Sequence, residues 1–181
     1  MNRSFFKSFF SVSSWTGISR VFGLIRDVLL AAALGAGPAS DIFLVAFKLP
    51  NMFRRLTAEG ALVQSFLPEY TSQDIKSSIG AKNLAQDIQS TLLIALFVIV
   101  LLAEIFMGFI ISCLAPGFKV NPSKFQMTID YARITITYLP MISLVALWGS
   151  IAQASGRFFP IAAAPVLLNI SLISGSILII S

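Results

Sequence analysis

The sequence predicts an all-α membrane protein with about five transmembrane helices, forming one membrane domain over residues 1–181. Of the 181 residues, 56% are hydrophobic and only 12% are charged, whereas about a quarter of the residues of a soluble domain are charged. Three of the apolar stretches are each long enough to cross a bilayer core of ~30 Å at ~1.5 Å per helical residue. Too little polar surface remains to cover a water-soluble globule, so lipid must surround much of the chain.

The first helix is expected at about 9–34, where the breaker Gly35-Ala36-Gly37-Pro38 ends it. Its basic start resembles that of a signal peptide. The apolar run is too long for one, contains Arg20 and Arg26, and has no small-x-small cleavage site before them. We therefore expect this segment to be retained as a membrane helix.

The second helix is expected at about 41–58, with Ser40 as a candidate N-cap. The stretch from Ser40 to Phe53 would cover only about 21 Å as a helix. To span the bilayer, the helix must carry Arg54 and Arg55 into the headgroup layer, where their long side chains can snorkel.

Three further helices are expected at about 88–114, 134–154 and 158–181. The stretch 59–87 is polar and of mixed charge, which predicts a cytoplasmic loop with a short interfacial helix at Leu62–Phe66. Because the sequence stops in apolar residues, we expect either a truncated gene product or one part of a larger transporter.

The distribution of Lys and Arg predicts a cytoplasmic N-terminus. With that orientation the outer connections hold two basic residues, Lys119 and Lys124. The inner segments hold seven, namely Arg3, Lys7, Arg54, Arg55, Lys76, Lys82 and Arg157. The formal net charge of +5 is thus explained by topology. It does not indicate nucleic-acid binding, because no basic cluster with interleaved aromatic residues occurs.

The first helix carries Arg20, Arg26 and Asp27 within its apolar sequence. Each such charge costs ~2.5–3.5 kcal/mol at the centre of a membrane helix, so all three must face protein or a water-filled cavity. At about 100° per residue, one face collects Ser13, Gly17, Arg20, Leu24 and Asp27. Arg26 lies on the flank, and Gly17 and Gly23 either leave room beside the arginines or allow close helix packing.

Positive charge exceeds negative charge in the first two helices and the residues that follow them. Four arginines and Lys48 face three carboxylates, Asp27, Asp41 and Glu59. A surplus of guanidinium groups in a cavity suits an anion, and the planar fork of Arg binds phosphate through two hydrogen bonds. The alternative is structural: Arg20 or Arg26 pairs with Asp27 or Asp41 and only joins helices.

Pro50 lies within the second helix, between Lys48 and Asn51, and is expected to kink or break it. Broken helices occur at membrane depth where the backbone lines a cavity or gate. A simple proline kink is the alternative. Arg55 and Glu59 are four residues apart and can form a surface ion pair.

Catalytic chemistry finds little support in the sequence. His is absent and Cys113 is the one cysteine, so the commonest general base and metal ligand are missing. No phosphate-binding P-loop, metal-ligand spacing or Ser/His arrangement occurs. We expect no enzyme activity, no catalytic residue, no metal and no cofactor.

Several motifs in order resemble the MurJ/MviN family of lipid II flippases, within the multidrug/oligosaccharidyl-lipid/polysaccharide exporter superfamily. They run over nearly the whole chain: Ser19-Arg20-Val21-Phe22-Gly23-Leu24-Ile25-Arg26-Asp27, Asp41-Ile42-Phe43, Phe47-Lys48-Leu49-Pro50-Asn51, Arg54-Arg55-Leu56, Ala58-Glu59-Gly60-Ala61, Ala115-Pro116-Gly117-Phe118 and Ala164-Pro165-Val166-Leu167-Leu168-Asn169-Ile170-Ser171. The resemblance implies two lobes around a cationic, V-shaped cavity in the bacterial inner membrane. This chain would supply most of the first lobe.

The resemblance also implies a substrate, lipid II, which is an undecaprenyl-pyrophosphate-linked disaccharide-pentapeptide. Alternating access would move it from the cytoplasmic to the outer leaflet for peptidoglycan synthesis. By motif, substrate binding would fall to Arg20, Arg26, Asp41 and Arg54. The portal or gate would comprise Asp27, Lys48, Pro50, Asn51, Arg55, Glu59 and Gly60.

Family members are near three times as long as this chain, so a separate C-terminal chain is an expected partner, along with membrane lipids. Three alternatives stay open. The chain could be a related exporter of polysaccharide-linked lipids, a non-transporting scaffold of the wall machinery, or a non-functional gene fragment. The scaffold alternative predicts that replacing Arg20 and Arg26 by Gln is harmless.

Overall fold

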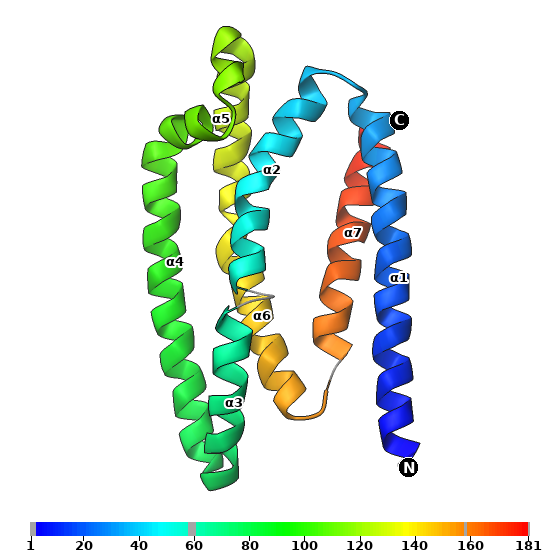
Figure 1. The fold of residues 1–181 in the computed structure, drawn as a ribbon, viewed down its shortest axis with the longest axis vertical. Coiled ribbons are helices and arrows are strands. Elements are labelled where there is room, and N and C mark those ends of the chain that lie inside the picture. Colours follow the sequence, from blue (N-terminus) through cyan, green and yellow to red (C-terminus); the bar gives the residue numbers. More distant parts are fainter. Residues whose placement is uncertain (1–2, 58–60, 158, 181) are drawn as a thin grey trace. The chain divides into compact units, whose positions relative to one another are not determined.

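A computed structural model describes residues 3–57, 61–157 and 159–180, with side chains described at 17–53, 64–157, 159–160 and 163–180. Every regular element in these ranges is a helix (Figure 1), and 93% of the structure is helical. Three of the described stretches are long and apolar enough to cross a membrane: Ser78–Leu114, Pro122–Ala154 and Ala163–Ile180. The all-α membrane fold class is therefore confirmed, and the total of five spans stays a prediction.

The chain divides into two compact units. The first comprises residues 1–37 and 152–181 and contains α1 (Arg3–Leu34) and α7 (Phe159–Ile180), which pack against each other. The second comprises residues 38–151. We describe each unit by itself, and one membrane domain over 1–181 stays a prediction.

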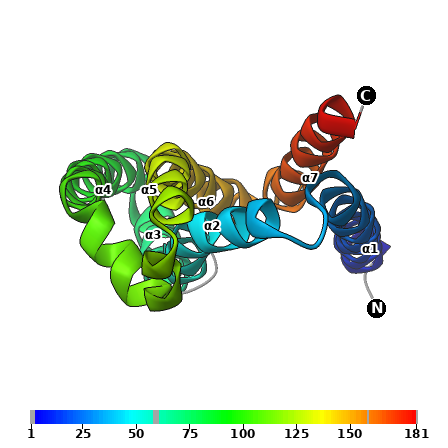
Figure 2. The same cartoon turned by 90° about the horizontal axis from the view of Figure 1, so that it is seen from above.

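The second unit contains five α-helices and a short 3₁₀ helix. They are α2 (Pro38–Thr57), α3 (Ala61–Lys76), α4 (Ser78–Leu114), η1 (Pro116–Val120), α5 (Pro122–Ile136) and α6 (Tyr138–Ala154, whose last turn belongs to the first unit). Helix α5 lies beside both α2 and α4, and α3 runs back along the first half of α4 (Figures 1 and 2).

The core of the second unit is apolar and lies where α2, α4, α5 and the start of α6 meet. Its buried members are Ala46, Leu49, Leu96, Ala103, Met107, Ile111, Ile129, Ala132, Ile136 and Leu139. Four of the large side chains, Met107, Ile111, Ile136 and Leu139, are 0% exposed. These residues recur at helical spacing in each segment, so the sequence pattern itself directs them to one interface.

The stretch 59–87, expected as a loop with one short helix at 62–66, is more helical than that, because α3 occupies 61–76 and α4 begins at Ser78. Its cytoplasmic location stays a prediction. The Ser77 hydroxyl accepts a hydrogen bond from Gly80 N at 3.2 Å and caps α4. Phe66 and Tyr70 of α3 are buried, with ring centroids 5.4 Å apart. The polar sequence does not predict the full length of α3 or the start of α4, because a cap and the packing of the two helices on each other stabilise them.

Two other boundaries also move. Helix α2 begins at Pro38, so Ser40 lies inside the helix and is not its N-cap; proline suits the first helical position because its missing N–H would be unpaired there anyway. The helix expected at 134–154 is preceded by α5 and interrupted at Thr137. The interruption follows from Pro140, whose ring clashes with the carbonyl four residues before it.

Candidate functional site

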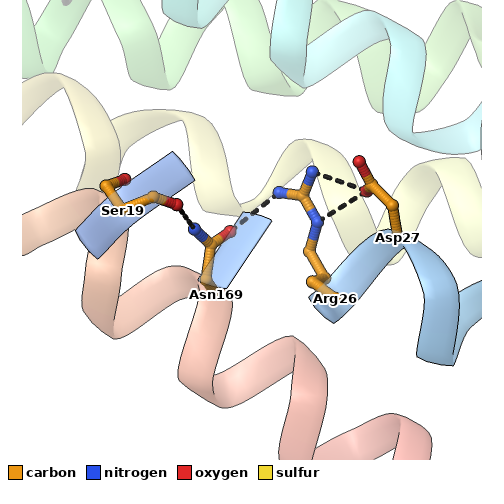
Figure 3. A network of polar contacts seen from close by, with 4 residues as sticks. All are labelled: Ser19, Arg26, Asp27 and Asn169. Atoms are coloured by element: carbon orange, nitrogen blue, oxygen red, sulfur yellow. Dashed lines mark hydrogen bonds and ion pairs between the residues drawn. The ribbon is translucent and has the colours of Figure 1, made fainter. Parts of the chain in front are cut away.

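The contact between α1 and α7 is built around a buried amide. Asn169 is only 5% exposed. Its Nδ2 donates to the carbonyl oxygen of Ser19 at 3.1 Å, and its Oδ1 accepts from Arg26 Nη1 at 2.9 Å (Figure 3). A methyl group on Gly23 would lie 3.7 Å from Asn169 Nδ2, so this glycine also faces α7. Ser19, Gly23 and Arg26 therefore form one stripe along α1.

The Arg26 guanidinium is held on two sides. Its Nε and Nη2 donate to Asp27 Oδ1 at 3.0 and 2.7 Å, while Nη1 donates to Asn169. The Arg26 side chain is 28% exposed and that of Asp27 is 64% exposed. Asp27 thus neutralises the charge of Arg26 at the helix surface; this is one of the pairs named in the structural alternative, but it lies within one helix and does not join two.

Arg20 lies on a different face of α1 from the stripe that contacts α7. It is about 100° from Ser19 around the helix axis, and Leu24 and Asp27 share its face. The residue is exposed. Among the side chains that the structure describes, no carboxylate or amide pairs with Arg20, so its full positive charge is available.

Asp41, expected in substrate binding, pairs with a lysine. Its Oδ2 lies 2.6 Å from Lys124 Nζ, which joins the first turn of α2 to the first turn of α5. Lys124 also lies 4.0 Å from the ring centroid of Phe118, a favourable cation–π position. The ion-pair partner of Asp41 is thus a lysine, and not one of the two arginines that the structural alternative considered for it.

Pro50 neither breaks α2 nor ends it, because the helix continues to Thr57. Proline lacks an N–H, so the carbonyl of Ala46, four residues earlier, loses its helical donor. The Thr135 hydroxyl of α5 donates to that oxygen at 2.9 Å. The neighbouring helix thus satisfies the carbonyl that Pro50 leaves free, and Pro50 itself is fully buried.

The remaining predicted portal residues divide into two groups. Lys48 is exposed and has no ion-pair partner within the described side chains, while Asn51 is half-buried. Arg54 and Arg55 lie in the last turn of α2, and their side chains are not among those described. Glu59 and Gly60 lie outside the described residues.

Within the described part of the chain, no group of three His, Cys, Asp or Glu could hold a metal ion. Three important partners escaped the sequence analysis: Asn169, Lys124 and Thr135. Only Asn169 carried a signal, as the one amide in the apolar stretch 159–180. Lys124 and Thr135 are ordinary in sequence, and their roles depend on the packing of α5 against α2.

Comparison with known proteins places these helices in a family. The family model described as lipid II flippase MurJ matches residues 30–181, most of the chain. The chain belongs to the MurJ family. The family resemblance seen in the motifs is therefore confirmed.

Two relatives are 40% identical to the chain. The probable lipid II flippase MurJ of Rickettsia prowazekii (strain Madrid E) aligns over 168 residues, 93% of this chain and 33% of the relative. The MurJ protein of Rhizobium meliloti (strain 1021), also named a probable lipid II flippase, aligns over 173 residues, 94% of this chain and 32% of the relative. The lipid II flippase MurJ of Burkholderia cenocepacia is 34% identical over 96% of this chain and 34% of its own. The chain thus spans about a third of the length of these MurJ relatives.

Proposed function

We propose that this chain is the N-terminal part of a lipid II flippase, which moves the lipid-linked peptidoglycan precursor from the cytoplasmic to the outer leaflet by alternating access. The names of the MurJ relatives support the substrate. One structural observation carries the proposal for this chain: Arg20 is an exposed guanidinium in a largely apolar helix, with no acidic partner among the described side chains. A charge so placed is expensive in lipid unless it receives an anion or faces water.

In this proposal the diphosphate of the lipid is bound by Arg20, Arg26 and Arg54. Asp41 contributes by holding Lys124 and thereby fixing α2 against α5. The portal comprises Asp27, Lys48, Pro50, Asn51, Arg55, Glu59 and Gly60. Guanidinium groups suit this task because their donors match phosphate oxygens in pairs.

We further propose that the chain lies in the bacterial inner membrane with its N-terminus in the cytoplasm. Its partners are lipid II, the surrounding membrane lipids and the part of the transporter that corresponds to the remaining two thirds of its relatives, whether in the same chain or another. The protein transports and does not catalyse a reaction. The proposed membrane location and the proposed transport role both suit a family described as a lipid II flippase.

The test is a chimera in which residues 1–181 replace the matching third of the Burkholderia cenocepacia flippase. Transport is measured as cleavage of newly made lipid II by a membrane-impermeant enzyme added outside the cells. We expect Arg20→Ala to lower the transport rate roughly 10- to 100-fold, the usual effect of losing a hydrogen bond to a charged group. Arg157→Ala is the matched control, since Arg157 is exposed in the connection between α6 and α7.

Normal transport by the Arg20→Ala chimera, at equal protein level in the membrane, would contradict the proposal. The scaffold alternative makes the opposite prediction for position 20. It expects Arg20→Gln to be harmless and changes of lipid-facing apolar residues to impair the wall.

A further inference from the structure

The Arg26 guanidinium is only partly occupied by the protein. A guanidinium carries five N–H donors. Three of them bind Asp27 and Asn169, through Nε, Nη2 and Nη1. One N–H on each terminal nitrogen remains without a partner among the described residues.

The two groups that hold Arg26 differ in what they contribute. Asp27 is adjacent in sequence, 64% exposed, and neutralises the charge. Asn169 is buried, comes from the other helix, and has both ends of its amide engaged. A buried amide with both ends hydrogen-bonded cannot rotate without losing two bonds, so it fixes the direction of Nη1.

From this geometry we propose that Asn169 is a positioning residue. Its Oδ1 orients the Arg26 guanidinium so that the two free N–H groups are presented to a phosphate oxygen of the ligand. The identity of that ligand rests on the proposed function; the orienting contact does not. Arg20 then supplies net charge, and Arg26, already neutralised by Asp27, supplies directed donors.

Asn169 has a second contact that makes this orientation specific to α1. Its Nδ2 donates to the Ser19 carbonyl, two turns before Arg26, and Gly23 between them faces the amide. The amide is therefore anchored on the helix that carries Arg26. A leucine at 169 would fill similar space but would offer no acceptor to Nη1.

The experiment uses the full 181-residue chain in lipid nanodiscs and the arginine reagent p-hydroxyphenylglyoxal, which attacks the terminal guanidinium nitrogens. Mass spectrometry gives the modification rate at Arg26 and, as an internal reference, at Arg20. We expect Asn169→Leu to raise the Arg26 rate about tenfold, as for loss of a hydrogen bond to a charged group. The Arg20 rate should not change.

Two further variants separate positioning from simple packing. Asn169→Asp keeps the acceptor for Arg26 but loses the donor to Ser19, so Arg26 should stay protected. Ser176→Ala removes another buried polar group of α7, whose hydroxyl donates to Leu172 O of its own helix, and should leave both rates unchanged. An unchanged Arg26 rate in Asn169→Leu would overturn the proposal. So would an equal rise at Arg26 in Ser176→Ala, which would indicate that any loosening of the contact between α1 and α7 exposes the guanidinium.

A second arm tests the ligand independently. Undecaprenyl diphosphate in the nanodisc should protect Arg26 and Arg20 of the unaltered chain from the reagent, and should protect Arg26 several-fold less in Asn169→Leu. If the lipid protects neither arginine, the proposed substrate contact fails at this site. The effect of Asn169→Leu on the rate without lipid would still decide the orienting role.

Discussion

The contact of α1 with α7 and the contact of α2 with α5 use polar groups in opposite ways. In the first, the ion pair of Arg26 and Asp27 lies within one helix, and a neutral amide, Asn169, joins the two helices. In the second, the ion pair of Asp41 and Lys124 itself joins the helices, and a hydroxyl, Thr135, adds a hydrogen bond.

The packing around these groups differs as well. The α2–α5 contact belongs to a large apolar core, whereas the buried residues described on α7 are Val166, Asn169 and Ser176. Small and polar residues let helices approach in lipid and satisfy each other's groups. The comparison indicates that apolar packing holds the second unit together, while the first is organised around a charge in mid-helix.

The largest effect should come from the apolar core. Leu139→Ala removes a side chain that is 0% exposed, and we expect it to lower the free energy of unfolding by about 2–5 kcal/mol. Unfolding would be followed by circular dichroism in mixed micelles. Met141→Ala, on the same helix but 67% exposed, is the control and should change it little. Equal losses in both variants would mean that burial does not organise this unit.

An intermediate effect is expected at the carbonyl of Ala46. Thr135→Val keeps the shape of the side chain but leaves a buried acceptor unpaired, which should cost about 1–2 kcal/mol of unfolding free energy. The loss should shrink when Pro50→Ala is added, because alanine restores the N–H that Ala46 O lacks. Denaturation of both single variants and the double variant measures the coupling.

Thr128→Val is the matched control for that cycle. Thr128 is more deeply buried than the half-buried Thr135, but its hydroxyl donates to Lys124 O within α5, a carbonyl with its own helical donor. It should lose less stability than Thr135→Val. If Pro50→Ala gave no recovery, the Thr135 hydroxyl would not be compensating for the proline.

The smallest effect is expected at the ion pair of α2 and α5. Asp41 is 55% exposed, and partly exposed pairs contribute only about 0.5–1 kcal/mol. A double-mutant cycle with Asp41→Asn and Lys124→Gln should give a coupling energy of this size, reduced by added salt. The exchanged pair Asp41→Lys with Lys124→Asp should recover it. A coupling above about 2 kcal/mol would place Asp41 among groups far less screened than its exposure indicates.

The sequence predicted the helices whose apolar residues are continuous, and failed where polar residues form helices by packing on a neighbour. The last residue of α1 and the first residue of α7 come close to their predicted positions, because Gly35 ends α1 with a φ of +64° and Gly156 lies in the turn before α7 with a φ of +74°. Helix α1 begins at Arg3, earlier than the predicted start at about 9. Helix α3 was predicted only as a short helix at 62–66, because the polar remainder of the segment becomes helical by packing against α4.

The charged residues of α1 were predictable for a different reason. A charge in an apolar run is conspicuous, and helical spacing already separates Arg20 from Arg26. Which carboxylate pairs with which base was not predictable, because Asp41 and Lys124 are 83 residues apart. The role of Thr135 was not predictable either, because its hydroxyl donates to a carbonyl of another helix.

Helix α4 is a 37-residue rod, about 55 Å long at 1.5 Å per residue, against a hydrocarbon thickness of ~30 Å. The polar first part of α4, which carries Lys82 and Asp87, must therefore extend beyond the hydrocarbon layer into water. Helix α3 packs along this extension. Because the helix is continuous, any tilt or rotation of the membrane part of α4 also moves that extension. Movement of α4 inside the bilayer therefore changes the position of its aqueous part and of α3.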